Sequence, residues 1–173
     1  MSTHEPPSLQ ELRARYPYQF AGPYLEIEVA KGWMSIFAKL CADVDAFLGH
    51  NKRGFYWSQI KEKFGSARFY HQLMGRHPNQ PLDLPTGHNI PVVDDRNEVE
   101  VNEHLVRLST QAEDATRYVC LACGKPGHWD DTAGYYLMVC PEHQAARRQA
   151  GDSRTEVEWE RLGPENGNTK ENS

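Results

Sequence analysis

The sequence has no long apolar run, no excess of positive charge and only four cysteines. No stretch approaches the roughly 20 consecutive apolar residues that a membrane-spanning helix needs. The polar opening segment 1–17 also lacks the apolar region of a secretory signal peptide, so we expect a cytoplasmic protein. The formal net charge of −5 disfavours general nucleic-acid binding, because surfaces that bind phosphates normally have a basic excess.

Recognisable catalytic motifs are missing as well. The sequence has no nucleophile with an adjacent base, no glycine-rich phosphate loop, no His-Glu-x-x-His helix and no pair of carboxylates in a coherent setting. We therefore predict no catalytic residues. With 173 residues, of which 39% are hydrophobic, the chain suffices for one core with a small appended module.

Three of the cysteines lie close to a histidine in the C-terminal third of the chain. Cys120 and Cys123 form a Cys-x2-Cys pair, and Cys140 and His143 form a Cys-x2-His pair after the spacer 124–139. In a reducing compartment such spacings indicate a metal rather than disulfides. Three thiolates and one imidazole complete the tetrahedral coordination of a structural zinc site, so we predict that these four residues hold Zn²⁺.

The residues around these ligands predict a treble-clef-like unit of knuckle, hairpin and helix. Gly124 lets the backbone turn directly after the second cysteine. Residues 135–139 are β-prone, and Pro141 fits the first turn of a helix that continues over 142–150. Alternatives remain open: ordinary buried cysteines, His128 in place of His143, or a catalytic zinc with three protein ligands and a water.

Two amphipathic helices are predicted before the zinc unit. Apolar residues recur at every third or fourth position over 33–48 and over 98–118. Gly49 fits the C-cap of the first of them, and Cys41 falls on its apolar stripe as a buried thiol. A shorter helix is predicted over 8–16.

The aromatic-rich segments 55–64 and 66–73 predict a β-hairpin that turns at Gly65. The face of the first strand that ends in Ile60 and Phe64 is predicted to pack on the core. Prolines and polar residues in the segment following the hairpin predict a long loop over 75–97.

These segments together predict an α+β fold, with amphipathic helices packed on a small antiparallel β-hairpin or sheet and a C-terminal treble-clef-like zinc unit. The predicted divisions are an N-terminal arm over 1–31, an α+β core over 32–118, the zinc-binding unit over 119–150 and a disordered tail over 151–173.

Basic residues alternate with aromatic ones on the predicted hairpin. A possible ligand-binding surface there consists of Lys61, Lys63, Arg68 and Tyr70. Such a pattern can hold phosphates and stack bases, but lysines on a solvated strand also protect a sheet edge from aggregation. Arg147 and Arg148, the other basic residues of a nucleic-acid hypothesis, also suit the C-terminal end of a helix without any ligand.

A nuclease of the HNH class is a further alternative, because that class shares the treble clef. Its candidate residues would be His88-Asn89 or His50-Asn51. Both pairs lie outside the predicted knuckle, hairpin and helix, and the 124–139 spacer is short for an inserted catalytic hairpin. We therefore rank this reaction class last.

The string from Ile60 to Tyr70, followed by a long helix and the CxxCG…CxxH pattern, resembles a family of small uncharacterised proteins in phages, prophages and bacteria. Ser66 and Ala67 stand where that family pattern has glycine and leucine. The resemblance implies a core hairpin joined to a zinc knuckle. Because such genes lie on mobile elements, it favours a non-enzymatic protein that binds a protein partner as an immunity or anti-defence inhibitor. The rival hypothesis is a zinc-dependent regulator that binds nucleic acid.

Overall fold

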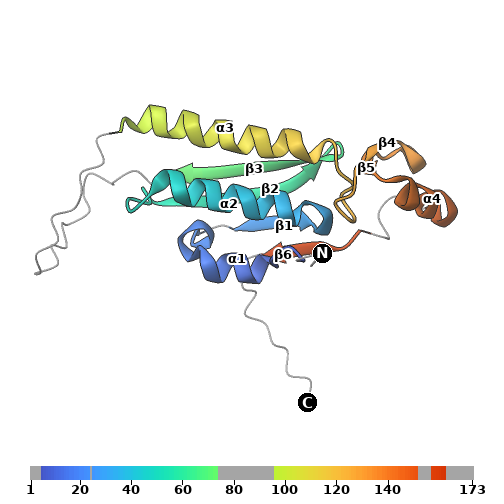
Figure 1. Ribbon diagram of the computed structural model, residues 1–173, viewed down its shortest axis with the longest axis horizontal. Coiled ribbons are helices and arrows are strands. Elements are labelled where there is room, and N and C mark those ends of the chain that lie inside the picture. The colour runs from blue at the N-terminus through green and yellow to red at the C-terminus, as the bar shows by residue number, and fades with distance from the viewer. Residues whose placement is uncertain (1–4, 24, 74–95, 152–156, 163–173) are drawn as a thin grey trace, which may run out of the picture.

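The computed structural model of the protein describes residues 5–23, 25–73, 96–151 and 157–162 (Figure 1). The predicted long loop 75–97 lies almost wholly outside these ranges, as do His88 and Asn89. Among the helices in the described ranges, none is both long enough and apolar enough to cross a bilayer.

The described part of the chain contains four α-helices, three short 3-10 helices and six strands. The α-helices are α1 (Leu9–Arg15), α2 (Met34–Leu48), α3 (Glu98–Thr116) and α4 (Pro141–Ala150). The strands are β1 (Glu26–Ala30), β2 (Phe55–Lys63), β3 (Ser66–Leu73), β4 (His128–Asp130), β5 (Leu137–Val139) and β6 (Trp159–Leu162). The 3-10 helices are η1 (Pro17–Phe20), η2 (Lys31–Trp33) and η3 (Thr132–Gly134). All four predicted helices and the predicted hairpin are therefore present.

The main sheet is mixed and has the strand order β3-β2-β1-β6. Strand β1 runs parallel to β2 and antiparallel to β6, whereas β2 and β3 form the predicted antiparallel hairpin. The sheet is thus larger than the antiparallel hairpin that the sequence predicted. The α+β class itself is confirmed.

Two strands of this sheet come from segments for which no strand was predicted. Strand β1 lies in the predicted arm, and its Ile27 and Val29 are fully buried. Strand β6 lies in the tail that was expected to be disordered, and it is ordered by backbone pairing with β1 and by burial of Leu162. This corrects the expectation for residues 159–162, because a four-residue edge strand gets its order from the neighbouring strand and from burial of its apolar side chains.

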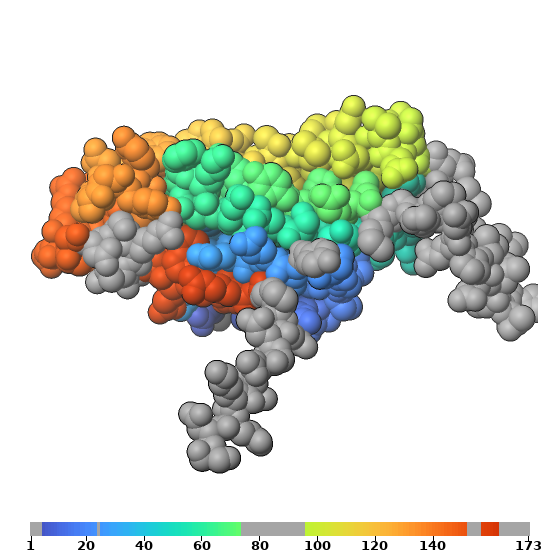
Figure 2. All heavy atoms as spheres, turned by 180° about the vertical axis from the view of Figure 1, so that it is seen from behind, coloured from blue at the N-terminus to red at the C-terminus, as the bar shows by residue number. Residues whose placement is uncertain are grey.

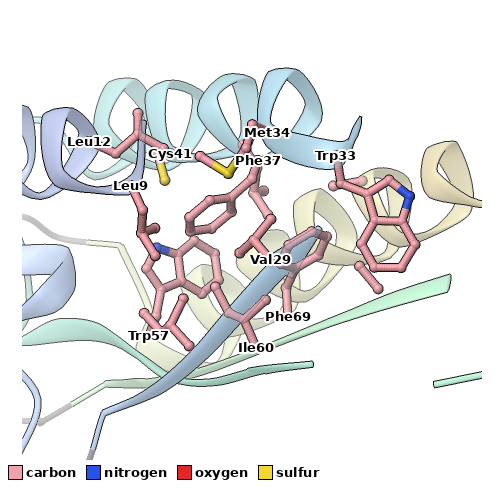
Figure 3. Packing of buried hydrophobic residues seen from close by; sticks show 14 of the residues in the cluster. Leu9, Leu12, Val29, Trp33, Met34, Phe37, Cys41, Trp57, Ile60 and Phe69 are labelled. Atoms are coloured by element: carbon pink, nitrogen blue, oxygen red, sulfur yellow. The ribbon is translucent and has the colours of Figure 1, made fainter. Parts of the chain in front are cut away.

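Helices α1, α2 and α3 cover one face of the sheet (Figure 1). Seen from behind, the strands themselves form the surface (Figure 2). The core therefore lies in one layer between the helices and the sheet. In it Phe37 of α2 stacks on Phe69 with ring centroids 5.5 Å apart and meets the edge of Trp57 at 5.7 Å (Figure 3).

A buried polar side chain links three elements of this core. Gln19 of η1 is fully buried, and its amide donates to the carbonyl oxygen of Cys41 at 2.8 Å and accepts from the Trp57 indole at 3.0 Å. Its hydrogen bonds offset the cost of burying these polar groups. Cys41 itself is the buried thiol that its position predicted, and burial raises its pKa.

The β2–β3 hairpin departs from the predicted pattern in two places. A bulge between Trp57 and Gln59 changes the alternation of faces. At the turn, Phe64 and Gly65 both have positive φ angles, 51° and 75°, as two-residue hairpin turns of the favoured hand require. The Phe64 side chain is 65% exposed, so the prediction that it packs on the core is wrong.

Candidate metal centre

The four predicted ligands lie together in the C-terminal unit. The Sγ atoms of Cys120, Cys123 and Cys140 and a ring nitrogen of His143 all lie within 4.8 Å of one another. The Sγ atoms of Cys123 and Cys140 are 3.8 Å apart, and Cys120 Sγ is 3.6 Å from His143 Nδ1. Cys140 Sγ lies closer to the same nitrogen, at 3.1 Å.

Two of these distances match those between ligands of one tetrahedral zinc ion. Bond lengths of about 2.3 Å for Zn–S and about 2.0 Å for Zn–N imply roughly 3.8 Å between two sulfurs and roughly 3.5 Å between sulfur and nitrogen. The donor set of three thiols and an imidazole also suits zinc. The cluster is therefore consistent with a structural zinc site, in which four protein ligands fill the coordination sphere and leave no position for a substrate.

The first ligand pair lies in a tight knuckle. The Gly124 amide donates to the carbonyl of Cys120 at 2.8 Å, and the Cys120 amide donates to the carbonyl of Lys125 at 2.7 Å. Gly124 has a φ of +75°, a conformation that residues with a side chain rarely adopt. This confirms the role that its place after Cys123 predicted.

The second ligand pair opens α4. Cys140 is the N-cap residue, Pro141 begins the helix, and His143 follows within the first turn. Burial works to raise the pKa of Cys140, but hydrogen bonds from the His143 backbone and ring and contacts with the other thiols lower it to about 6. The lowered pKa favours the thiolate, which is the form that binds metal.

The Cys123 thiol is shifted in the opposite direction. Burial together with the neighbouring Cys120 and Cys140 sulfurs raises the pKa of Cys123 to about 11, so a metal must displace its proton. His128 lies on β4, exposed and outside the four-residue cluster. His143 rather than His128 is thus the fourth member of the site.

A buried ion pair holds the second half of the unit together. Arg147 of α4 and Asp130 of β4 are 3% and 2% exposed and bond to each other. Arg147 also donates to the carbonyls of Thr132 and Tyr135 at 3.1 and 3.0 Å, while Asp130 accepts from Gln144 at 3.0 Å. Arg147 is therefore a structural residue, which removes it from the set proposed for nucleic-acid binding.

The zinc unit docks on the core through backbone contacts at Gly32 of η2. The Gly32 amide donates to the carbonyl of Leu121 at 2.8 Å. A Cβ atom on Gly32 would lie 2.2 Å from the carbonyl oxygen of Cys120 and 2.6 Å from the amide nitrogen of Gly124. Only glycine fits here, because these neighbours are backbone atoms of the knuckle itself.

Gly32→Ala is accordingly expected to push the knuckle off the core, lower the free energy of unfolding by about 1–3 kcal/mol and weaken zinc binding. Competition with a chromogenic zinc chelator would measure the affinity. Gly151→Ala is the control, because a Cβ there meets nothing within 4 Å and only backbone strain is added. An unchanged zinc affinity in Gly32→Ala would show that the contact is not needed for the site.

The predicted ligand-binding surface lies on the open face of the sheet. Lys61 and Arg68 stand directly opposite each other on β2 and β3, and the Lys61 ammonium lies 5.6 Å from the Tyr70 ring centroid. Acidic residues share this face: Glu26 accepts from Gln59 at 2.6 Å, and Glu28 lies 3.4 Å from Arg161. The face therefore has mixed charge rather than a basic stripe.

The remaining nuclease candidates lie far from the zinc unit. His50 and Asn51 follow the C-terminal end of α2, at the opposite end of the molecule (Figure 1). The Asn51 carboxamide accepts from the Arg53 amide at 3.1 Å and so forms part of a local turn. The structure does not bring this pair to the metal site.

An exposed aromatic cluster was missed from the sequence. Phe64, Trp129 and Tyr136, which we call the aromatic patch, are 65%, 54% and 54% exposed. Together with Asp130 and Asp131 they line a pocket of about 510 Å³. Two features of the sequence could have indicated this cluster: Phe64 occupies a turn position, and Trp129 lies in a polar stretch between the zinc ligands.

The comparisons with known proteins assign neither a family nor a function to the chain. Comparison of the chain with known protein families, curated proteins and solved structures finds no match. The four-residue cluster and the fold together define the class: a zinc-binding protein of the α+β type.

Proposed function

We propose that this chain is a non-enzymatic, zinc-stabilised protein that binds a protein partner through the aromatic patch. The observation that carries the proposal is the gathering of Phe64, Trp129 and Tyr136, each more than half exposed, around one pocket. Contiguous exposed apolar surface marks interaction sites. Aromatic side chains are also enriched in protein interfaces, where they supply large contact area.

Contacts between the hairpin and the zinc unit support a rigid patch. The Tyr135 hydroxyl donates to Glu62 at 2.6 Å. A Cβ on Gly65 would lie 3.1 Å from Trp129 Cζ3, so the hairpin tip lies against the Trp129 ring. Because Trp129 and Tyr136 lie between the two ligand pairs, a bound zinc ion would hold two of the three residues of the patch in place. A preorganised surface loses less entropy when it binds.

The kind of partner rests on the resemblance to proteins of phages and prophages. In that setting the partner is a toxin or a host defence protein, and the chain acts as an immunity or anti-defence inhibitor that covers its surface. The net charge of −5 suits a basic partner, because opposite charge speeds encounter and disfavours wrong partners.

Affinity capture from native lysate with matched variants tests the proposal. The wild type is compared with a variant in which Phe64, Trp129 and Tyr136 are all replaced by serine, and with Tyr118→Ser, which removes an aromatic ring that is 72% exposed and lies outside the pocket lining. One stoichiometric protein should be captured by the wild type and by Tyr118→Ser. The triple variant should lose it by about 10-fold or more, since central interface aromatics often contribute 2 kcal/mol or more.

Zinc content and circular dichroism of the triple variant must match the wild type, so that lost capture reports the surface and not unfolding. Equal capture by all three proteins would contradict the proposal.

The alternative, a nucleic-acid-binding regulator, is favoured by the pairing of Lys61 with Arg68 beside Tyr70 on the open sheet face. If this alternative is correct, nucleic acid should be recovered with the protein, and nuclease treatment or high salt should remove it. Replacement of Lys61 and Arg68 by glutamine would then abolish retention, whereas the aromatic-patch variant would keep it.

A further inference from the structure

We propose that the pocket of the aromatic patch binds the guanidinium group of an arginine side chain on the partner protein. This inference rests on the proposed function, in which the patch meets a protein, and it names the chemical group that enters the pocket.

The rings form walls rather than a flat surface. The Trp129 and Tyr136 ring centroids are 6.3 Å apart, and the ring planes meet at 77°. Phe64, in the turn at the hairpin tip, completes the aromatic lining of the pocket of about 510 Å³. Ring faces carry partial negative charge, and a cation within about 6 Å of a centroid is attracted to them.

The lining also has one uncompensated negative charge. Asp130 lines the pocket, but its carboxylate is paired with Arg147, accepts from Gln144 and has Arg148 at 3.9 Å. Asp131 is exposed, and within the described residues its carboxylate makes no hydrogen bond or ion pair. It therefore offers a free carboxylate beside the aromatic walls.

A resident cation shows that one of the rings accepts positive charge. The Lys63 ammonium lies 5.6 Å from the Phe64 ring centroid. Lys63 is exposed, so water hydrates its ammonium strongly. An incoming cation then has to compete with Lys63 at Phe64, but not at Trp129 or Tyr136.

Arginine matches this combination better than lysine or an apolar side chain. Its planar guanidinium stacks on aromatic faces, is more weakly hydrated than an ammonium and pairs with a carboxylate through two parallel hydrogen bonds. An apolar side chain would leave the Asp131 charge next to a dehydrated surface without a partner, which is costly. Arginine is also among the residues that most often anchor protein interfaces.

The test uses two small probes that differ in charge but hardly in shape: N-acetyl-arginine amide and N-acetyl-citrulline amide. Each is titrated into the ¹⁵N-labelled, zinc-loaded full chain, and the indole signals of the four tryptophans are followed by NMR. Trp129→Phe identifies the Trp129 signal. The arginine probe should shift that signal and leave the buried Trp33 and Trp57 unchanged, and it should bind about 10-fold more tightly than citrulline.

Two variants locate the charge. Asp131→Asn should weaken arginine binding by about 5-fold, and Glu100→Gln, which removes an exposed carboxylate on α3, should leave it unchanged. Equal binding of arginine and citrulline, or no loss in Asp131→Asn, would overturn the proposal.

The probe titration and the partner capture can fail independently of each other. Capture of a partner that depends on the aromatic patch, with no response to the arginine probe, refutes the arginine pocket alone. Binding of the probe with no patch-dependent partner refutes the protein-binding function and leaves the pocket as a site for a guanidinium-containing molecule.

Discussion

Cys123→Ser is expected to abolish stoichiometric zinc binding and unfold residues 119–150. A structural zinc ion in a small module contributes about 10–16 kcal/mol, which is comparable with or larger than the net stability of a whole domain. Cys123 is the exposed cysteine of the cluster, so the substitution leaves core packing largely intact and tests the ligand itself. Metal analysis of the purified protein and the ¹⁵N NMR spectrum measure the two effects.

Cys41→Ala is the matched control for this result. Cys41 is fully buried but lies outside the four-residue cluster. It should retain one zinc per chain and lose only the modest stability of a small buried side chain. Full zinc content and an unchanged spectrum in Cys123→Ser would refute the metal site, and the proposed organisation of the C-terminal unit with it.

Arg147→Met is expected to lower the free energy of unfolding by about 3–5 kcal/mol, because it leaves the buried Asp130 carboxylate without its countercharge. The guanidinium also holds the carbonyls of Thr132 and Tyr135, so β4, η3 and α4 lose a common anchor. Urea unfolding followed by circular dichroism measures the change.

Arg147→Met should also raise the pH at which the protein unfolds on acidification. Burial works to raise the pKa of Asp130, but hydrogen bonds from Gln144 and Thr132 and the Arg147 charge bring it below its usual value. Its stabilising contribution is therefore present above the unfolded-state pKa of about 3.9 and is lost as pH falls through the lowered folded-state pKa. Without Arg147 the folded-state pKa rises, so acid unfolding should begin at higher pH.

Lys125→Ala is the control for the ion pair. Lys125 and Glu142 are 3.1 Å apart, but both side chains are largely exposed, at 64% and 73%. Solvent screens such a pair, so its loss should leave the urea midpoint unchanged. If Lys125→Ala and Arg147→Met lowered the urea midpoint equally, the buried Asp130–Arg147 pair would stabilise the fold no more than an exposed ion pair does.

The zinc ligands could be predicted from the sequence because their information is local. Two residues separate the members of each pair, and Gly124 and Pro141 are the residues that a knuckle and a helix start require. Helices α2 and α3 were predictable for the same reason, since a single stripe of apolar residues indicates which side faces a core. The hairpin also needed only neighbouring segments around Gly65.

Partners distant in sequence decided the rest. Strand β1 pairs in parallel with β2 and antiparallel with β6, and the short segment 159–162 becomes a strand where β1 offers it an edge. Likewise, Phe64 and Trp129 line one pocket because the hairpin tip at Gly65 lies against the Trp129 ring. The sequence by itself determined the metal ligands and the main helices, because spacing along the chain encodes them. Only the tertiary structure decided the sheet order and the aromatic patch, because both depend on contacts that no local pattern specifies.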